Sequence, residues 1–356
     1  MTDDDVLPYL QERLPDFVPA GKPRHLPEGN LNVVWRVPGE ERSVIVKYAP
    51  PHIAVDPDTP LDPSRLLIEA RCLEALGPEG MLENVRRASV RAPRPLDVND
   101  DGHVLVMEDL GDWPTLGRWL HEHDPEAVRE RTPAIGQQLG AFIGTLHATT
   151  VGNKACADVF DNRSMQETRY AVQYQGVTDM LRAAGVPDAE KLGARAEALG
   201  KDLLETGRCL TMGDLWPPSV LVADDALHLI DWELAHYGRP LQDVAHVLAH
   251  LWMQAHRAPS PAVADAVGSL RASFLAAYEH ALGDTAEALW TKQEQRNAAV
   301  HFGAEILVRA VGPFQAGYVY EGLDPDHAAV QEAVATAARR VRIPASVGPG
   351  LLGESR

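Results

Sequence analysis

Two short stretches in the second half of the chain decide its fold. Residues 212–219 read Met-Gly-Asp-Leu-Trp-Pro-Pro-Ser, and residues 229–233 read Leu-Ile-Asp-Trp-Glu. Between them, apolar runs on either side of an Asp-Asp pair predict a small hairpin over 220–230. Asp214 therefore precedes the hairpin and Asp231 follows its second strand directly. An aspartate in a loop is often a turn residue, but this placement around a hairpin favours a catalytic site.

The first hundred residues are predicted to form short strands and a helix. Segments 33–37 and 43–48 are rich in Val and Ile and are joined by Pro-Gly-Glu-Glu, which predicts a hairpin. A loop rich in Pro and Asp follows over 50–63, and a helix is expected to begin near Arg65. A further strand is predicted over 103–107, before a polar connector that contains glycine.

Helical periodicity dominates the rest of the chain. Apolar residues between 135 and 146 recur on one face of a long predicted helix. Further helices are predicted over about 262–282, 292–311 and 327–341. The sequence therefore predicts an α+β, two-lobed architecture with a ligand cleft between the lobes. Residues 1–110 form the small β-rich lobe in this prediction, and residues 111–356 form the larger, mainly helical lobe.

Composition narrows the class of protein. The chain has 51 acidic and 33 basic residues and a formal charge of −18, which argues against nucleic-acid or anionic-membrane binding. Cys72, Cys156 and Cys209 form no Cys-x-x-Cys pair, so neither a disulfide framework nor a zinc site is expected from them. The acidic amino terminus leads into no apolar segment, and we find no stretch suited to cross a membrane. We expect a soluble cytoplasmic protein.

The chain lacks the Gly-rich motifs of P-loop and dinucleotide-binding folds, but it has the groups that phosphoryl transfer needs. Lys47 lies in an apolar strand, where a lysine can reach nucleotide phosphates, and Glu69 lies on the next helix and can pair with it. Asp214 can orient an acceptor hydroxyl. Asp231 and Glu233 offer carboxylate oxygens, which Mg²⁺ prefers.

Other polar and aromatic side chains permit two interpretations. His246 and His250 have the i, i+4 spacing of two metal ligands, but the glutamate of His-Glu-x-x-His is missing and helix packing is favoured. Trp216 and Trp232 fit core and pocket walls equally well. Arg309 lies in an apolar helical stretch and needs a partner, such as a carboxylate or a ligand.

The motifs occur in an order that resembles the aminoglycoside phosphotransferase superfamily, which has a protein-kinase-like fold. Several blocks are most similar to methylthioribose kinases and their relatives. The resemblance runs from about residue 26 to 322, and its blocks are Glu28-Gly-Asn-Leu-Asn32, Ser43–Lys47, Leu61-Asp-Pro-Ser-Arg65, Ile68-Glu69-Ala70, Met107-Glu-Asp-Leu110, Gly213-Asp214, Leu229-Ile-Asp-Trp-Glu233, Ala235-His-Tyr-Gly238 and Ile306–Gly312.

The resemblance implies a nucleotide site in the first lobe. Asn30 and Asn32 would belong to a loop over the phosphates, in place of the Gly-rich loop of protein kinases. Lys47 would contact the α- and β-phosphates, and Glu69 would hold it. The backbone from Glu108 to Leu110 would bind adenine, with Met107 leading into this hinge.

The resemblance also implies the roles of residues in the second lobe. Asp214 would orient or deprotonate the acceptor hydroxyl, and Asp231 and Glu233 would bind Mg²⁺. Ser219 takes the place of the metal-binding asparagine of aminoglycoside kinases, as in methylthioribose kinases, which transfers metal binding to Glu233. Arg309 would face the acceptor. Trp216 and Trp232, which differ from the methylthioribose kinase pattern, would flank the acceptor side.

Together these features predict an enzyme that transfers the γ-phosphate of ATP or GTP to a hydroxyl of a small, sugar-containing molecule, with Mg²⁺ as cofactor. A ribose-type metabolite is one candidate acceptor, and a sugar-bearing antibiotic, whose modification would confer resistance, is the other. An inactive nucleotide-binding protein is disfavoured because Lys47, Asp214, Asp231 and Glu233 are all present. A homodimer is possible, and neither a nucleic-acid nor a membrane partner is expected.

Overall fold

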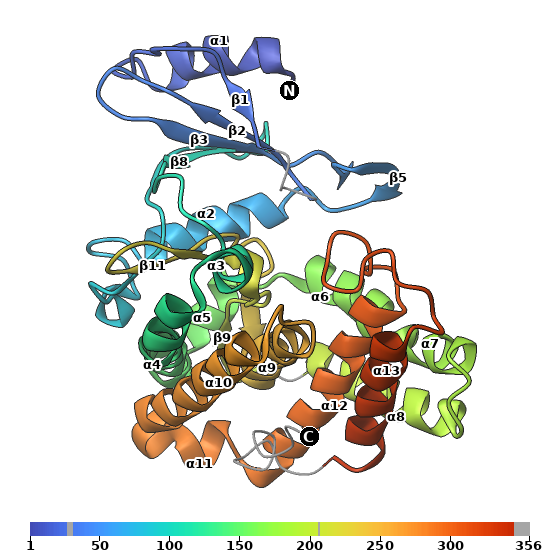
Figure 1. Ribbon diagram of the computed structural model, residues 1–356. Helices are drawn as coiled ribbons and strands as arrows, with labels where there is room; N and C mark the ends of the chain where they lie inside the picture. Colours follow the sequence, from blue (N-terminus) through green and yellow to red (C-terminus); the bar gives the residue numbers. More distant parts are fainter. Residues whose placement is uncertain (27–30, 206, 345–356) are drawn as a thin grey trace.

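The computed structural model describes residues 1–26, 31–205 and 207–344. Its first lobe is a five-stranded antiparallel sheet in the order β1-β2-β3-β8-β7 (Figure 1). The strands are β1 (Arg24–His25), β2 (Val33–Val37), β3 (Val44–Tyr48), β7 (Pro95–Asn99) and β8 (Val104–Glu108). The predicted strands over 33–37, 43–48 and 103–107 are thus confirmed.

The two faces of this sheet pack against different helices. Val44 and Val46 of β3 face a small core that is covered by α1 (Asp3–Arg13). Side chains of a strand alternate between faces, so Ile45 and Lys47 point to the opposite face. That face packs against α2 (Arg65–Ala75), which lies between the sheet and the helical lobe (Figure 1). The alternation places Lys47 at the junction of the two lobes.

The second lobe is mainly helical. Its long helices α4 (Pro125–Thr150) and α10 (Pro261–Leu282) pack closely, since Gly140 of α4 has no side chain. A Cβ at this position would lie only 2.2 Å from the carbonyl oxygen of Phe274 on α10. The other helices are α3 (Leu116–Glu122), α5 (Lys154–Val159), α6 (Arg163–Arg169), α7 (Val177–Ala183), α8 (Ala189–Glu205), α9 (Leu241–His256), α11 (Ala286–Leu289), α12 (Lys292–Ala310) and α13 (Ala328–Arg342). A π-helical turn, Tyr170–Gln175, continues α6.

Two small sheets position the loops that carry the predicted site. Strands β10 (Val220–Val222) and β11 (Leu227–Leu229) form the predicted hairpin, and β11 also pairs with β6 (Val90–Arg91). Strand β9 (Cys209–Thr211) pairs with β12 (His236–Gly238). The loop with Asp214 follows β9, and the loop with Asp231 and Glu233 follows β11.

The sequence analysis predicted the long elements well and some short ones poorly. The helices expected over 262–282, 292–311 and 327–341 are present, and the small sheet and larger helical lobe confirm the predicted α+β, kinase-like fold. The segment 50–63, predicted as a loop, contains the hairpin of β4 (His52–Ile53) and β5 (Asp56–Pro60). Strand β5 reads Asp-Pro-Asp-Thr-Pro and is exposed throughout, so it lacks the apolar alternation that predicts a strand. The lobe boundary at residue 110 stays a prediction. None of the helices in the described ranges is both long and apolar enough to cross a membrane.

Candidate active site

Lys47 joins the two lobes through ion pairs. Its Nζ lies 2.9 and 3.0 Å from the two carboxylate oxygens of Glu69 on α2, and 2.5 Å from Oδ1 of Asp231. Burial alone would lower the pKa of Lys47, but the surrounding carboxylates outweigh it and raise the pKa above its ordinary value. The lysine therefore stays charged, as a phosphate-binding cation must.

Asp231 has the backbone strain that often marks a functional residue. Its φ of 65° lies in the left-handed region, which non-glycine residues rarely adopt. Its side chain is 40% exposed, in contrast to the buried side chains of Lys47 and Glu69. The loop after β11 thus presents an accessible carboxylate beside a buried cation.

Glu233 lies in a buried polar cluster that the sequence analysis did not foresee. Its Oε2 accepts a hydrogen bond from Asn32 Nδ2 at 2.9 Å and pairs with Nε of Arg65 at 3.0 Å. Arg65 also donates to Asn32 Oδ1 and to the carbonyl of Leu31. Burial raises the pKa of Glu233, against the opposing effect of Lys47 and Arg65. Arg65 therefore ties the start of α2 to the loop before β2 and to the loop of Glu233.

This cluster gives the side chain of Asn32 a defined role. It is buried and is engaged on both its oxygen and its nitrogen, so it positions Glu233. That its loop covers the phosphates stays a prediction. Asn30, predicted for the same loop, lies outside the described residues. The sequence signal for Arg65 was its place in the Leu61–Arg65 block, but an arginine at a helix start carries no indication of its partner.

The loop that carries Asp214 is held from behind by Asp243 of α9. Asp243 accepts hydrogen bonds from the backbone amides of Met212 at 2.9 Å and Gly213 at 2.8 Å. Nε2 of His147, which is fully buried, lies 3.0 Å from the same carboxylate. Gly213 has a φ of 82°, and a Cβ there would lie 2.1 Å from the carbonyl oxygen of Leu234. The turn before Asp214 therefore requires glycine.

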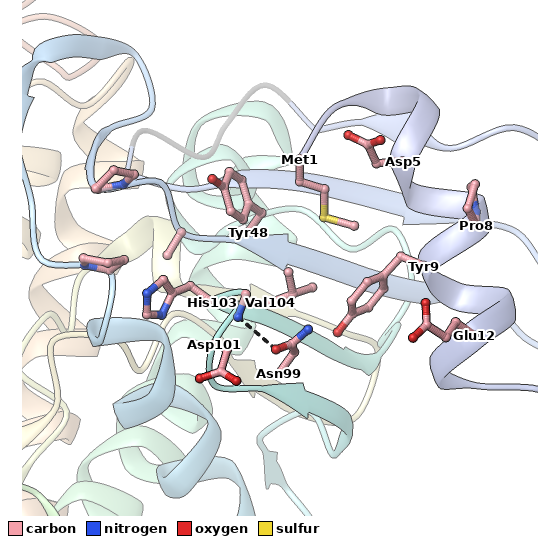
Figure 2. Close-up of a pocket in the computed structure, with 14 residues that line it drawn as sticks. Met1, Asp5, Pro8, Tyr9, Glu12, Tyr48, Asn99, Asp101, His103 and Val104 are labelled. Carbon is pink, nitrogen blue, oxygen red and sulfur yellow. Dashed lines mark hydrogen bonds between the residues drawn. The ribbon is translucent and has the colours of Figure 1, made fainter.

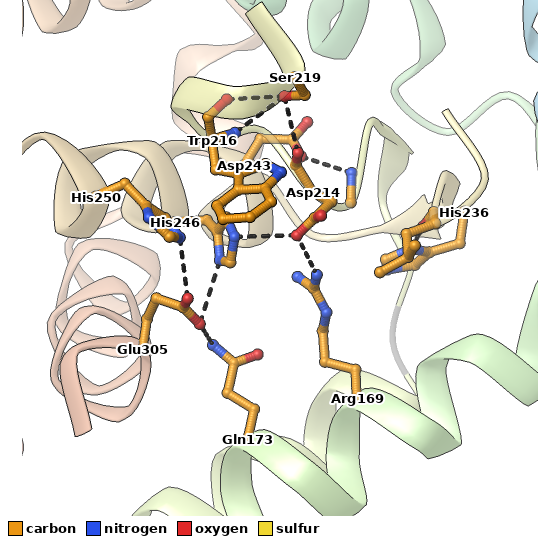
Figure 3. A network of polar contacts seen from close by, with 12 residues as sticks. Arg169, Gln173, Asp214, Trp216, Ser219, His236, Asp243, His246, His250 and Glu305 are labelled. Carbon is orange, nitrogen blue, oxygen red and sulfur yellow. Dashed lines mark hydrogen bonds and ion pairs between the residues drawn. The ribbon is translucent and has the colours of Figure 1, made fainter. Parts of the chain in front are cut away.

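Two basic side chains hold Asp214 (Figure 3). Oδ1 accepts from Nη2 of Arg169 at 2.9 Å and lies 3.2 Å from Nε2 of His246. Burial by itself would raise the pKa of Asp214, but His246 and the neighbouring arginines outweigh it and lower the pKa to about 2. Asp214 is therefore a firmly ionised carboxylate that is well suited to orient a hydroxyl and poorly suited to retain a proton.

Arg309 lies on the same side as Asp214, within an aromatic cluster. Its Nε pairs with Oε1 of Glu305 at 2.9 Å, and its guanidinium lies 4.4 Å from the ring of Trp216. The rings of Phe314 and Tyr318 are each 5.3 Å away. These last two residues belong to the segment between α12 and α13, at the end of the helical lobe that faces the sheet (Figure 1). Glu305 is thus the carboxylate partner that a charged side chain in this apolar helical stretch needs.

Two other predicted site residues are buried structural groups. Trp232 has no exposed surface, packs against Phe142 and donates its indole N–H to the carbonyl of Leu229. The prediction that Trp232 flanks the acceptor is therefore wrong, and the core alternative holds. Ser219 is also fully buried, and its hydroxyl bonds to the backbone of Asp214 and Trp216. Its hydroxyl therefore shapes the loop that carries Asp214, and its predicted part in nucleotide binding stays a prediction.

The predicted adenine-binding segment follows β8. Met107 is buried on the face of the sheet that packs against α2. The amide of Glu108 donates to the carbonyl of Arg94, so that N–H is not free to bind a base. The carbonyl of Leu110 accepts from the indole N–H of Trp113. Two backbone groups of the predicted hinge are therefore engaged within the chain, and adenine binding by the remaining groups of residues 108–110 stays a prediction.

A shallow cavity of about 650 Å³ lies away from these residues. It is lined by α1 and by the ends of β3 and β8, with Tyr9, Tyr48 and Asn99 in its wall (Figure 2). None of the predicted site residues lines it. The site at the lobe junction is identified by its chemistry and not by this cavity.

The chain is similar to several small-molecule kinases. The 4-hydroxytryptamine kinase of Psilocybe cyanescens is 28% identical over 269 residues, which are 71% of this chain and 74% of that protein. The methylthioribose kinase of Geobacillus sp. (strain WCH70) is 25% identical over 265 residues, 68% of this chain and 63% of that protein.

Solved structures support the same fold. An amicoumacin kinase in complex with AMP-PNP, Ca²⁺ and Ami superposes with a TM-score of 0.56 at 13% identity, over 96% of this chain and 93% of that chain. Choline kinase LicA from Streptococcus pneumoniae superposes with a TM-score of 0.52 at 14% identity, over 95% and 99% of the two chains. At these identities the likeness concerns the fold alone. The sequence model of the phosphotransferase enzyme family, APH, matches residues 22–292, and the chain belongs to that family of small-molecule kinases.

Proposed function

We propose that this enzyme transfers the γ-phosphate of ATP to a hydroxyl group of a small, sugar-containing acceptor. The observation that carries the proposal is the contact of Lys47 with both Glu69 and Asp231, which joins a nucleotide-binding lobe to an accessible carboxylate. Asp214 lies on the neighbouring loop and is ionised. These are the parts that phosphoryl transfer requires, since it depends on positioning and charge neutralisation.

Lys47 would bind the α- and β-phosphates and Asp231 would hold Mg²⁺ together with Glu233. The donor set fits this ion, because both groups are carboxylates and Asp231 is exposed. When bound, Mg²⁺ neutralises the charge on the transferring phosphoryl group. Arg65 and Asn32 keep Glu233 in place by binding its Oε2. The relative with AMP-PNP supports an adenine nucleotide, and GTP is the alternative.

The acceptor would bind beside Asp214. Both contacts of Asp214 use Oδ1, which leaves Oδ2 for the acceptor hydroxyl. Arg169 and Arg309 are paired with Asp214 and Glu305, so these four groups leave no surplus of negative charge to attract a polycationic aminoglycoside, which favours a neutral acceptor. An antibiotic-modifying role would therefore require an antibiotic that carries little positive charge.

A second acceptor class is an aromatic hydroxyl compound. Phe314 is 41% exposed, and it stands with Trp216 around the guanidinium of Arg309. Exposed rings beside the reactive carboxylate can stack on a planar acceptor as well as on a sugar. The resemblance to 4-hydroxytryptamine kinase supports this class, and the resemblance to methylthioribose kinase supports the sugar.

A substrate screen tests the proposal. Purified protein with Mg-ATP or Mg-GTP is incubated with methylthioribose, other pentoses, hydroxyindoles, choline, and nucleoside and aminoglycoside antibiotics, and phosphorylated product is measured by mass spectrometry. We expect product with neutral sugars or hydroxyindoles and none with polycationic aminoglycosides. Failure to phosphorylate any hydroxyl compound, in a protein that binds Mg-ATP, would contradict the proposal.

We also propose a reducing, cytoplasmic location. Cys72, Cys156 and Cys209 are all free and buried, which fits a compartment where thiols stay reduced. The possible homodimer stays a prediction, which sedimentation of the purified chain would decide.

Replacing Glu233 with Gln is expected to raise the Mg²⁺ concentration for half-maximal activity by roughly tenfold, the scale of about 1.4 kcal/mol. The amide keeps the shape of the side chain but removes the charge that both the metal and Arg65 use. A magnesium titration of kcat at saturating ATP measures the effect. Wild-type behaviour in this titration, in a folded variant, would remove Glu233 from the metal site.

Replacing Arg309 with Ala is expected to lower kcat/KM for the acceptor by roughly ten- to a hundredfold, with little change in the KM for ATP. The guanidinium carries five donors in a planar fork and is held in place by Glu305 and Trp216. Steady-state kinetics with each substrate varied in turn measure both constants. Arg296→Ala, an exposed position on the same helix, is the matched control. A normal acceptor KM in folded Arg309→Ala would exclude Arg309 from the site.

A further inference from the structure

Two helices bring four potential metal-binding groups together behind Asp214. His246 and His250 lie one turn apart on α9, and His301 and Glu305 lie one turn apart on α12. All four side chains are buried. We call them the His246 cluster. The phosphoryl transfer proposed above uses none of these histidine rings to bind the nucleotide. The presence of three buried histidines side by side therefore requires another explanation.

Each histidine ring of the cluster has one nitrogen that points to other members of the cluster, which we call its inner nitrogen, and one outer nitrogen that points away. The inner nitrogens lie close together. Ligand atoms of His246, His250 and Glu305 all lie within 4.8 Å of one another. Nε2 of His250 is 2.9 Å from Oε1 of Glu305, and Nδ1 of His246 is 3.6 Å from Oε2. Nε2 of His301 is 3.4 Å from Nδ1 of His246. Tetrahedral ligands of a zinc ion stand roughly 3.4 Å apart, so the spacing of His246, His250 and Glu305 suits a common ion.

The outer nitrogens of the same rings all face oxygen atoms. Nδ1 of His250 lies 2.6 Å from the hydroxyl of Tyr318, and Nδ1 of His301 lies 2.6 Å from the hydroxyl of Tyr174. Nε2 of His246 lies 3.2 Å from Oδ1 of Asp214 (Figure 3). A metal-binding histidine typically gives its other ring nitrogen to such a partner, which fixes the tautomer and the ring orientation.

One inner nitrogen lacks a satisfactory hydrogen bond. In the described part of the chain, Nε2 of His250 is fully buried and forms no hydrogen bond, although Glu305 Oε1 is only 2.9 Å away, and the outer Nε2 of His246 likewise has only its 3.2 Å contact with Asp214. The two atoms are close but not aligned for N–H donation. Buried polar atoms are rarely left unsatisfied in folded proteins, and coordination to an ion would satisfy this nitrogen. Glu305 also accepts from Gln173 and Arg309, which leaves lone pairs free, because a carboxylate has about four.

We propose that His246, His250 and Glu305 bind a divalent transition-metal ion of the zinc class. Nitrogen donors favour such an ion over Mg²⁺, which prefers oxygen, so this site is separate from that of Asp231. The ion would connect α9 to α12. It would also fix the ring of His246, whose Nε2 faces Asp214. His246 is then a positioning residue that ties the metal to the carboxylate beside the acceptor.

Metal analysis of the full chain, expressed without a polyhistidine tag, tests the inference. After dialysis against buffer with trace Zn²⁺, elemental analysis is expected to find about one zinc ion per chain. Exchange for Co²⁺ should give the visible absorption of a tetrahedral nitrogen-ligated ion. Phenanthroline should lower the melting temperature of the protein. These measurements do not depend on kinase activity. The zinc site can therefore be refuted while the proposed function stands, and the proposed function can be refuted while the zinc site stands.

The variants His250→Gln and Glu305→Gln are expected to lose at least about nine-tenths of the bound zinc. His256→Gln is the matched control: it lies on the same helix, and its ring likewise contacts a tyrosine hydroxyl and a carboxylate, those of Tyr320 and Glu332. This control should keep the metal. Wild-type protein without stoichiometric zinc or a cobalt band would overturn the inference and leave a metal-free hydrogen-bond network. Loss of zinc in His256→Gln alone would also overturn it. Where a variant fails to fold, the wild-type result decides.

Discussion

Asp214→Asn is expected to lower kcat by roughly 10²- to 10⁴-fold while the affinity for Mg-ATP stays nearly unchanged. The carboxylate is held by Arg169 and His246, and in the proposed function it faces the acceptor, whereas the nucleotide would bind at Lys47 and Asp231. An amide at this position has the same shape but cannot attract the hydroxyl proton of the acceptor. Single-turnover measurements of product, together with nucleotide binding by calorimetry, separate the two effects.

The acid dependence of the rate gives a second check on Asp214. Its pKa is lowered to about 2, so the carboxylate is ionised at neutral pH and stays so until the solution is strongly acidic. A loss of activity between about pH 5 and 7 must then come from another group, such as Glu69, whose pKa burial raises to about 7. Asp225→Asn, an exposed acid in the β10–β11 turn, serves as the control. Substantial turnover by Asp214→Asn would contradict the catalytic assignment.

Asp231→Asn is expected to remove Mg²⁺-dependent nucleotide binding and to lower kcat/KM by roughly 10²- to 10³-fold. The substitution removes the exposed carboxylate that, in the proposed function, would offer oxygen to the metal, and a metal contributes several kcal/mol of charge stabilisation to phosphoryl transfer. It also removes a partner of Lys47, which still retains Glu69. Calorimetric titration with ATP, in the presence and absence of Mg²⁺, measures the loss directly.

The backbone conformation of Asp231 indicates that the variant folds, so that a loss of nucleotide binding can be assigned to the missing charge. Its left-handed φ of 65° is a conformation that asparagine also tolerates, so the variant should fold. Circular dichroism and the melting temperature check that expectation. If folded Asp231→Asn bound Mg-ATP as tightly as the wild type, the metal would have to be assigned to other groups, and Glu233 would be the first to test.

Local patterns in the sequence determined the framework of the site. The alternation of Val44-Ile45-Val46-Lys47 predicted a strand with a lysine on a face of the sheet, and the hairpin between Asp214 and Asp231 was visible as two apolar runs around a turn. Such patterns depend on the period of a strand or helix and on turn residues, which neighbours along the chain specify. The order of these motifs also indicated the family before any contact was known.

Contacts between distant segments were decided by the tertiary structure. The sequence does not show that Arg65 and Asn32 bind Glu233, or that Arg169 reaches Asp214, because such pairs arise only when separate elements pack. Burial likewise decided that Trp232 belongs to the core, since an aromatic side chain suits a core and a pocket equally. The His246 cluster shows the same limit: the spacing on each helix is visible in the sequence, but the convergence of the two helices depends on how α9 packs against α12.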